Sequence, residues 1–321
     1  MSDSRSRGGA VLVVGEILTE FMPACIGQSM SGAVHFDKFA GGAPATYAAQ
    51  IAACRRPARI LSKVGKDPFS TFELDALIAA GVDVSLVSRL PDRQIGLCFH
   101  QCLDGLTSLI FYRHDSAAST LCPDDIDPEA IRSAAALHVP GTTMQISESA
   151  MAASLKAIRL AREAGVVISF DPNVRSILGS LETSRAAEEA MAAADLMTPT
   201  LEEARAITGK ADPYEAAREL RARGPQLVAV TLAAEGAVLL AEGDAVLCPG
   251  YQVEVIEPTG AGDCHAAATM VGFLNGWDLE RIGDFANAAG AHAVTAMGHL
   301  GPALPSLEQI RALQERGHGL P

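Results

Sequence analysis

The most restrictive feature of this sequence is the alternation of two kinds of segment from Leu137 onward. Short apolar runs rich in β-branched residues have the length of buried strands, and longer Ala-rich segments carry apolar residues at helical spacing. This alternation is typical of βαβ units around a parallel sheet, so we predict a doubly wound α/β sandwich. The candidate strands are residues 137–139, 166–171, 195–198, 227–231, 237–241 and 246–249, and the candidate helices are residues 148–164, 184–194 and 213–223.

The N-terminal third has a different pattern. Residues 11–14 open the same sheet, whereas residues 20–39 and 93–113 have the pattern of antiparallel strands joined by Gly- and Asp-containing turns. The apolar runs on either side of Asp104-Gly105 predict a hairpin, and we expect these pieces to form a small β lid. The expected organisation is a disordered N-terminus (1–9), one α/β domain (10–316) with inserted lid segments at about 19–40 and 93–113, and a C-terminal tail (317–321).

Composition and charge limit the classes of protein to which the chain can belong. Of its 321 residues, 49% are apolar, so it can bury a large core. No apolar stretch approaches the ~20 residues of a membrane-spanning helix. The net charge of −13 opposes binding to nucleic acid and to anionic lipid. Scattered cysteines and a polar start without a secretory signal favour a cytoplasmic location.

The segment that begins at Glu257 carries the chemistry. Gly260 and Gly262 allow the backbone to turn tightly and to approach a ligand. The helix that follows offers unpaired N–H groups to an anion, so residues 260–262, including Ala261, are candidates for an anion hole. Asp263 lies in the first helical turn, where its carboxylate can take a proton from an attacking hydroxyl during phosphoryl transfer. An ordinary helix start would show the same residues, because acidic residues stabilise a helix N-terminus.

A second glycine motif favours the catalytic interpretation. Gly41 and Gly42 directly precede an Ala-rich helical segment with Pro44 near its first turn. The motifs Gly41-Gly42-Ala43-Pro44-Ala45-Thr46 and Glu257-Pro258-Thr259-Gly260-Ala261-Gly262-Asp263 together resemble the PfkB, or ribokinase-like, family of carbohydrate kinases. The resemblance covers nearly the whole chain, with the motifs in family order. It implies a ribokinase-like fold with a β lid, MgATP as a substrate, and Asp263 as the catalytic base beside the anion hole.

Within that family, residues 62–70, 111–119 and 170–175 are similar to 2-keto-3-deoxygluconate kinases. The resemblance implies that Arg113 and Arg175 approach the acid end of the sugar, where a guanidinium can hold a carboxylate through two hydrogen bonds. The other residues implied at the substrate are Gly41, Gly42, Thr46, Glu20 and Phe111. We therefore expect ATP-dependent phosphorylation of the terminal hydroxyl of a keto sugar acid.

The resemblance also implies a nucleotide side. Thr200 and Glu203 match a family motif whose Glu organises Mg²⁺ and phosphate, so Glu203 is the implied metal-organising residue. Thr231 and Gly236 are expected near phosphate or ribose, and Asn287 is expected at the nucleotide. The sequence leaves a monovalent-cation requirement open.

Several residues depart from the family pattern. Thr200 and Thr46 stand where the family has Asn, Ala233 where Gly is common, and Phe111 where sugar-acid kinases often have Tyr. Changes at Thr46 and Phe111 remove hydrogen bonds expected for substrate recognition. The Cys264-His265 pair is similar to tagatose-kinase-like members of the family. A kinase for a neutral ketohexose, tagatose or fructose, is therefore the alternative function, and a catalytically inactive sugar-binding or regulatory homologue is the second alternative.

Other patterns concern metals and partners. Cys98, His100 and Cys102 share one face of a predicted strand, but a structural zinc site needs four ligands and the sequence shows no second pair. Lid strands have unpaired edges that two subunits can cover mutually, so we expect a homodimer through the lid. The expected partners are a small sugar or sugar acid, without nucleic acid or membrane.

Overall fold

The computed structural model describes residues 8–25, 27–103, 106–173, 181–243 and 245–319. The strands are β1 (Val11–Val14), β2 (Leu18–Pro23), β3 (Phe36–Gly41), β4 (Ala58–Gly65), β5 (Asp83–Leu90), β6 (Gly96–Leu103), β7 (Leu106–Tyr112), β8 (Ala136–Pro140), β9 (Val167–Asp171), β10 (Leu196–Met197), β11 (Leu227–Thr231), β12 (Gly236–Leu240) and β13 (Ala245–Pro249). The helices are α1 (Ala43–Ala53), α2 (Pro68–Ala79), α3 (Pro128–Arg132), α4 (Gly141–Met144), α5 (Glu148–Ala164), α6 (Leu181–Ala193), α7 (Leu201–Thr208), α8 (Pro213–Arg221), α9 (Ala261–Leu274), α10 (Leu279–Ala293) and α11 (Leu307–Arg316).

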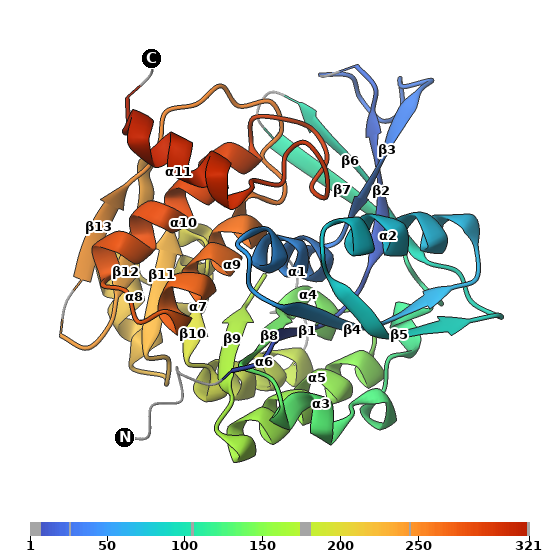
Figure 1. Ribbon diagram of the computed structural model, residues 1–321, viewed down its shortest axis with the longest axis horizontal. Coiled ribbons are helices and arrows are strands. Elements are labelled where there is room, and N and C mark those ends of the chain that lie inside the picture. Colours follow the sequence, from blue (N-terminus) through green and yellow to red (C-terminus); the bar gives the residue numbers. More distant parts are fainter. Residues whose placement is uncertain (1–7, 26, 104–105, 174–180, 244, 320–321) are drawn as a thin grey trace.

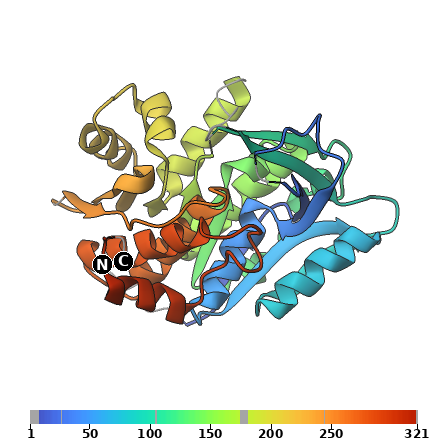
Figure 2. The ribbon, with the colours of Figure 1, turned by 90° about the horizontal axis from the view of Figure 1, so that it is seen from above.

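A large, mostly parallel sheet forms the centre of the molecule. Across the described residues its strand order is β13-β12-β11-β10-β9-β8-β1-β4-β5, and only the pairings of β12 with β11 and with β13 are antiparallel. Helices cover both faces (Figures 1 and 2). The doubly wound α/β sandwich is confirmed, and each candidate strand lies within one residue of an observed strand at either end.

Two separate apolar cores explain why the strands read as continuous apolar runs. Successive side chains of a strand point to opposite faces, so Val11 and Val13 of β1 enter one core and Leu12 and Val14 enter the other. Helices α1, α9 and α10 pack on the first face, and α5, α6 and α8 pack on the second. A strand buried on both faces has no polar alternation. No helix in the described part of the chain is long and apolar enough to span a bilayer.

The lid is a second sheet, with the strand order β3-β2-β6-β7 (Figure 1). The pairings of β2 with β3 and of β6 with β7 are antiparallel, as predicted. The two antiparallel pairs are joined through β2 and β6, which pair in parallel and for which the sequence predicted no pairing. The reason is that β2 follows β1 and β6 follows β5, and β1 and β5 run in the same direction in the large sheet. The predicted turn at Asp104-Gly105 and residues 1–7 of the predicted disordered N-terminus (1–9) lie outside the described residues.

Helix α2 anchors the lid through one buried carboxylate. Thr19 Oγ1 donates to Glu73 Oε1 at 2.8 Å, and Gly41 N donates to Glu73 Oε2 at 3.1 Å. Glu73 is completely buried. Burial raises the pKa of Glu73 well above its ordinary value, against the lowering effect of the two donated hydrogen bonds. Glu73 therefore binds a proton more readily in the folded chain than in the unfolded chain.

We expect Glu73→Gln to be at least as stable as the parent at pH 8. A raised folded-state pKa means that the contribution of Glu73 to stability is complete below its ordinary pKa and is lost as the pH rises through the folded-state value. Glu73→Ala should lose about 2 kcal/mol of unfolding free energy, because two buried groups lose their partner. Denaturant unfolding at pH 5 and pH 8 measures the unfolding free energy of each Glu73 variant. Glu188→Gln, which changes an exposed carboxylate, is the control. Equal losses in Glu73→Gln and Glu73→Ala would contradict this account.

Candidate active site

A cavity of about 680 Å³ lies between the lid and the carboxyl edge of the large sheet. The residues on its sheet side directly follow or end parallel strands: Glu16 after β1, Thr142 after β8, Asp171 at the end of β9, Thr198 after β10 and Thr231 at the end of β11. The lid contributes Glu20, Cys98, His100 and Phe111. Open α/β sheets bind ligands at this edge. The architecture therefore places a cavity beneath the lid where the fold class predicts a ligand site.

The start of α9 forms one wall of the cavity. Gly260 precedes the helix with φ 81° and ψ −14°, a left-handed conformation that favours glycine. A helical hydrogen bond runs from Cys264 N to Gly260 O at 3.0 Å, so the N–H groups of residues 261–263 precede the helical ladder. Gly260, Gly262 and Asp263 line the cavity, and Ala261 lies in the same turn. A half-buried carboxylate and a helix N-terminus thus face one space.

The glycine pair lies on the opposite side, at the start of α1. Gly42 has φ 97° and ψ 130°, and its N–H donates to Glu20 Oε1 at 3.1 Å. A Cβ atom on Gly41 would lie 2.3 Å from Glu20 Cδ, so this carboxylate occupies the space that a side chain would need. Gly42, Glu20 and Thr46 line the cavity. The pair is therefore required for the close approach of the lid carboxylate to the backbone.

Three buried hydroxyl groups point to a polar ligand. Thr46, Thr142 and Thr198 line the cavity, and within the described residues the Oγ1 atoms of all three have no hydrogen-bond partner. Buried polar atoms are nearly always hydrogen-bonded, so such atoms around a cavity indicate an occupant that donates or accepts hydrogen bonds. The motif predicts Thr46, but no local pattern distinguishes Thr142 or Thr198 from other threonines that follow strands.

Arg113 lines the cavity but already has a carboxylate partner. Its Nη1 donates to Glu16 Oε2 at 2.7 Å, and its guanidinium lies 4.3 Å from the centre of the Phe111 ring. Glu16 is 3% exposed, and burial raises its pKa even though Arg113 opposes the shift. Arg175 lies outside the described residues. The sequence predicted Arg113 at the substrate, whereas its pairing with Glu16 depends on a contact between distant segments.

The predicted nucleotide residues fall into two groups. Thr200 and Glu203 form the N-terminal capping box of α7, in which Thr200 N donates to Glu203 Oε2 at 2.8 Å. Both residues line the cavity, as does Thr231. Thr200 therefore keeps a capping role in place of the family Asn. Ala233, where the family commonly has Gly, has φ 52°.

Gly236 and Asn287 lie together farther along the sheet, near β13. A Cβ atom on Gly236 would lie 2.1 Å from Cys248 O, so this glycine permits the pairing of β12 with β13. Asn287 Nδ2 donates to Cys248 O at 2.9 Å and to Pro249 O at 3.0 Å. Neither residue is among the described residues that line the cavity. Both positions hold the sheet edge, and the structure adds no direct contact with the cavity.

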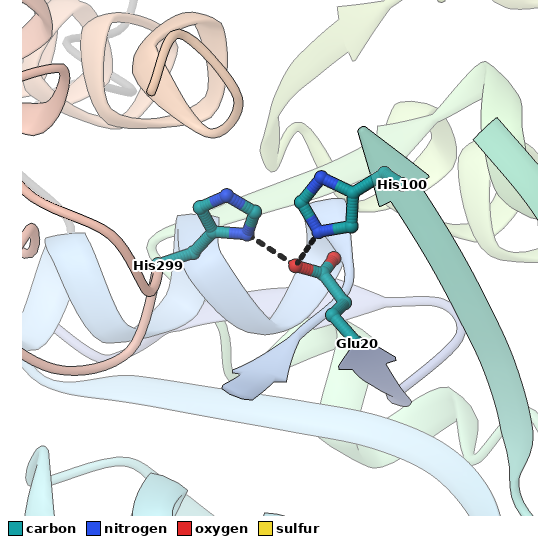
Figure 3. Close-up of side chains that lie close together, drawn as sticks. All are labelled: Glu20, His100 and His299. Atoms are coloured by element: carbon teal, nitrogen blue, oxygen red, sulfur yellow. Dashed lines mark ion pairs between the residues drawn. The ribbon is translucent and has the colours of Figure 1, made fainter. Parts of the chain in front are cut away.

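Glu20 is also the centre of a buried cluster with two histidines (Figure 3). His299 Nδ1 forms an ion pair with Glu20 Oε2 at 2.5 Å, and His100 Nε2 lies 3.5 Å from the same oxygen. The potential ligand atoms of these three residues lie within 4.8 Å of one another, the spacing of a possible metal group. His299 belongs to a loop after α10 and has no sequence signal, because its partners come from distant segments.

The cavity fits a phosphorylated nucleotide and a sugar. Its volume suits small-molecule ligands, and the start of α9 suits phosphate oxygens. Glu202 and Glu203 line the same space and offer the hard oxygen ligands that Mg²⁺ prefers. The residues present are therefore compatible with MgATP.

Comparisons with known proteins agree with this chemistry. The chain matches the pfkB family carbohydrate kinase pattern over residues 9–306. The 2-dehydro-3-deoxygluconokinase of Thermoproteus tenax is 34% identical over 287 residues, covering 87% of this chain and 86% of the relative. Fructokinase-1 of Oryza sativa subsp. japonica is 32% identical over 321 residues, covering 96% of this chain and 98% of the relative. A candidate Ribokinase II from E. coli, in a crystal structure with ATP and Mg²⁺, has a TM-score of 0.90 and 30% identity, covering 96% of this chain and 100% of that chain. The family match and the shared fold show that this chain belongs to the pfkB family of carbohydrate kinases.

Proposed function

We propose that the protein transfers the γ-phosphoryl group of ATP to the terminal hydroxyl of a keto sugar acid, with 2-keto-3-deoxygluconate as the first candidate. The observation that carries the proposal is the joint position of Asp263 and the glycine turn on one wall of the cavity. A carboxylate beside the N–H groups of a helix N-terminus can accept the proton of a hydroxyl while those groups stabilise charge on a phosphoryl group.

The remaining residues hold and orient the two substrates. The N–H groups that follow Gly260 form the anion hole, and Gly42 and Thr46 contact the sugar. On the nucleotide side, Glu203 supports Mg²⁺ and Thr231 lies near the phosphates. Bound Mg²⁺ supplies positive charge to the phosphate oxygens. Positioning of this kind provides most of the catalysis in phosphoryl transfer.

The position of Arg113 supports a substrate that carries a carboxylate. This arginine lines the cavity next to the buried Glu16 and contacts that carboxylate through its Nη1. A guanidinium has five N–H donors, so Arg113 keeps others for a substrate carboxylate. The Thermoproteus tenax relative carries the name of a kinase for the same sugar acid.

A neutral ketohexose is the second candidate, and the pairing of Glu16 with Arg113 favours it. A guanidinium that is neutralised by a buried carboxylate attracts a second carboxylate less strongly. The rice relative carries the name of a fructokinase. A coupled assay of ATP consumption across sugars and sugar acids separates the two candidates. Sugar binding without stimulated ATP consumption would instead indicate an inactive homologue. A cytoplasmic homodimer paired through the lid remains an expectation from the sequence.

We expect Arg113→Met to lower kcat/KM for 2-keto-3-deoxygluconate by about 30-fold, because a charged hydrogen bond to the substrate is lost. The value for fructose should change much less. Arg93→Met is the matched control, because Arg93 precedes the lid hairpin formed by β6 and β7. Its Nη1 lies 3.7 Å from Asp115 Oδ1, and Arg93 is not among the described residues that line the cavity. Steady-state kinetics with both sugars measures the difference. Equal losses for the acid and the neutral sugar would exclude the carboxylate contact.

A further inference from the structure

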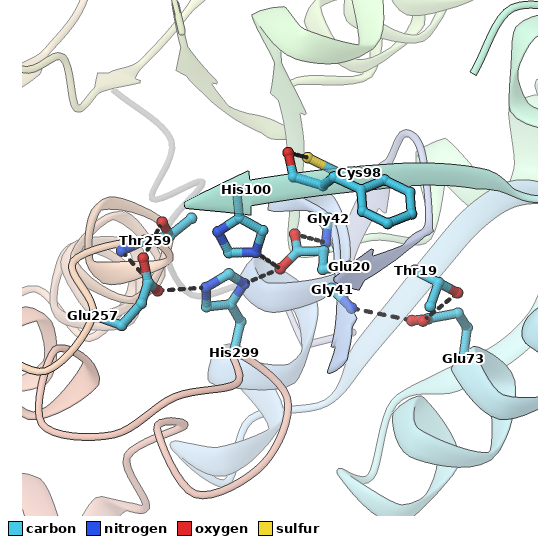
Figure 4. A network of polar contacts seen from close by, with 11 residues as sticks. Thr19, Glu20, Gly41, Gly42, Glu73, Cys98, His100, Glu257, Thr259 and His299 are labelled. Atoms are coloured by element: carbon cyan, nitrogen blue, oxygen red, sulfur yellow. Dashed lines mark hydrogen bonds and ion pairs between the residues drawn. The ribbon is translucent and has the colours of Figure 1, made fainter. Parts of the chain in front are cut away.

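A continuous set of polar contacts joins the two glycine motifs (Figure 4). Gly42 N donates to Glu20 Oε1 at 3.1 Å on the sugar side. His299 Nδ1 forms an ion pair with Glu20 Oε2 at 2.5 Å, and His299 Nε2 lies 3.2 Å from Glu257 Oε2. His299 thus bridges a carboxylate of the lid and a carboxylate that precedes α9.

Glu257 and His299 both fix the backbone of the glycine turn. Thr259 donates to the Glu257 carboxylate through its N at 3.1 Å and through its Oγ1 at 2.6 Å. The His299 ring packs directly on Gly260, since a Cβ atom there would lie 3.0 Å from His299 Cδ2. A displacement of the His299 ring would therefore move the turn that precedes Asp263.

The charges of this bridge are strongly coupled because all of its members are buried. Exposed fractions are 4% for His299, 7% for Glu20 and 5% for Glu257. Burial alone would lower the pKa of His299, but the two carboxylates raise it to about 10. His299 is thus an imidazolium at neutral pH, and interactions between charges are stronger in a buried environment than in water. His100 on β6 also faces Glu20, and Glu73 on α2 lies close enough for its charge to interact with that of Glu20.

The spacing of the cluster favours a direct ion pair between His299 and Glu20 over a metal ion that both residues bind. Two ligands of one tetrahedral zinc ion, each about 2.0–2.1 Å from the metal, lie about 3.3 Å apart. The ion-pair contact between His299 Nδ1 and Glu20 Oε2 is 2.5 Å, which is shorter than this separation.

We propose that His299 is a positioning residue that couples the sugar-side glycine pair to the glycine turn in front of Asp263. A sugar that contacts Glu20 or Gly42 fixes the position of the Glu20 carboxylate and thereby that of the His299 ring. The His299 ring in turn fixes the glycine turn through its contacts with Glu257 and Gly260. The anion hole therefore reaches its productive geometry together with the sugar. This inference rests on the proposed roles of Asp263 and the turn in phosphoryl transfer.

A set of double variants tests the coupling. The test measures kcat for Glu20→Gln, for Glu257→Gln and for the combination of the two substitutions. The same three changes are then made in a chain that also carries His299→Gln. In the parent, the effect of the combination on kcat should differ about tenfold from the product of the single effects, because the two carboxylates act on one bridge. In His299→Gln the effects should multiply. His292→Gln, a half-buried histidine on α10, is the matched control and should keep the coupling. Multiplicative effects in the parent would overturn the proposal.

Hydrogen exchange provides a second readout without turnover. With 2-keto-3-deoxygluconate or fructose added and no ATP, amides of residues 257–263 should exchange more slowly in the parent. In His299→Gln the same sugar occupancy should leave their exchange unchanged. His299→Gln leaves the carboxylates of Glu20 and Glu257 without a cationic partner, which can destabilise the fold. In that case the experiment uses the double variant Glu257→Gln/His299→Gln, in which one of these two carboxylates is removed. Protection that persists in the variants overturns the coupling. Absence of sugar-stimulated ATP consumption in the parent defeats the proposed function instead.

Discussion

Asp263→Asn is expected to lose about 1,000-fold in kcat while it folds normally. Asn has the same shape as Asp but does not accept a proton, so the variant removes the base and keeps the side-chain volume. Asp263 lies in the first turn of α9 beside the cavity, and the helix N-terminus remains available to phosphate. KM for ATP should therefore change little. The coupled assay measures kcat, and denaturant unfolding verifies the fold.

Asp278→Asn is the matched control for this variant. Asp278 caps α10 by accepting a hydrogen bond from Arg281 N at 2.8 Å, and it is not among the described residues that line the cavity. The change of charge at a helix N-terminus is the same in the two variants, but only one carboxylate faces the cavity. Comparable losses of kcat in both variants would mean that the helix-end charge matters and that Asp263 is not a base. Full activity in Asp263→Asn would also exclude the assigned role.

The large sheet could be predicted because its signals are local. Residues 227–230, for example, form a continuous apolar run, and together with Thr231 they form β11. Helices on both faces bury every side of such a strand, so the run identifies it without knowledge of its neighbours. The parallel pairing of β2 with β6 has no comparable signal, since each strand alone has the same pattern in either pairing.

The candidate site was predictable where one short segment holds the needed groups. Gly260, Gly262 and Asp263 lie in a single turn, so their proximity follows from the sequence alone. Glu16 and His299 are different, because each is defined by an oppositely charged partner from a distant segment. A buried ion pair requires both members in place, and neither member alone is distinguishable from an exposed charge in the sequence. The charge pattern of the cavity therefore emerged only from the structure.

Gly260→Ala is expected to lower kcat about 100-fold, the effect of a misplaced anion hole. Gly260 has φ 81°, and the new Cβ atom would lie 3.0 Å from His299 Cδ2 and 3.2 Å from His299 Cγ. The ring is held by Glu20 and Glu257, so the turn must move instead. A turn that moves carries the N–H groups of the anion hole away from the phosphoryl group. Steady-state kinetics at saturating ATP and sugar measures the loss.

An alanine at a positive φ strains the backbone at any position, and this strain must be distinguished from the contact with His299. The control variant is Gly209→Ala. Gly209 ends α7 with φ 71° and ψ 6°, close to the conformation of Gly260, and a Cβ atom there has nothing within 4 Å. Both variants should lose about 1 kcal/mol of unfolding free energy. Only Gly260→Ala should lose kcat, because only its methyl group meets the imidazolium that is fixed behind the turn. A loss of kcat in Gly209→Ala as large as that in Gly260→Ala would attribute the effect to backbone strain and would remove the anion hole from the explanation.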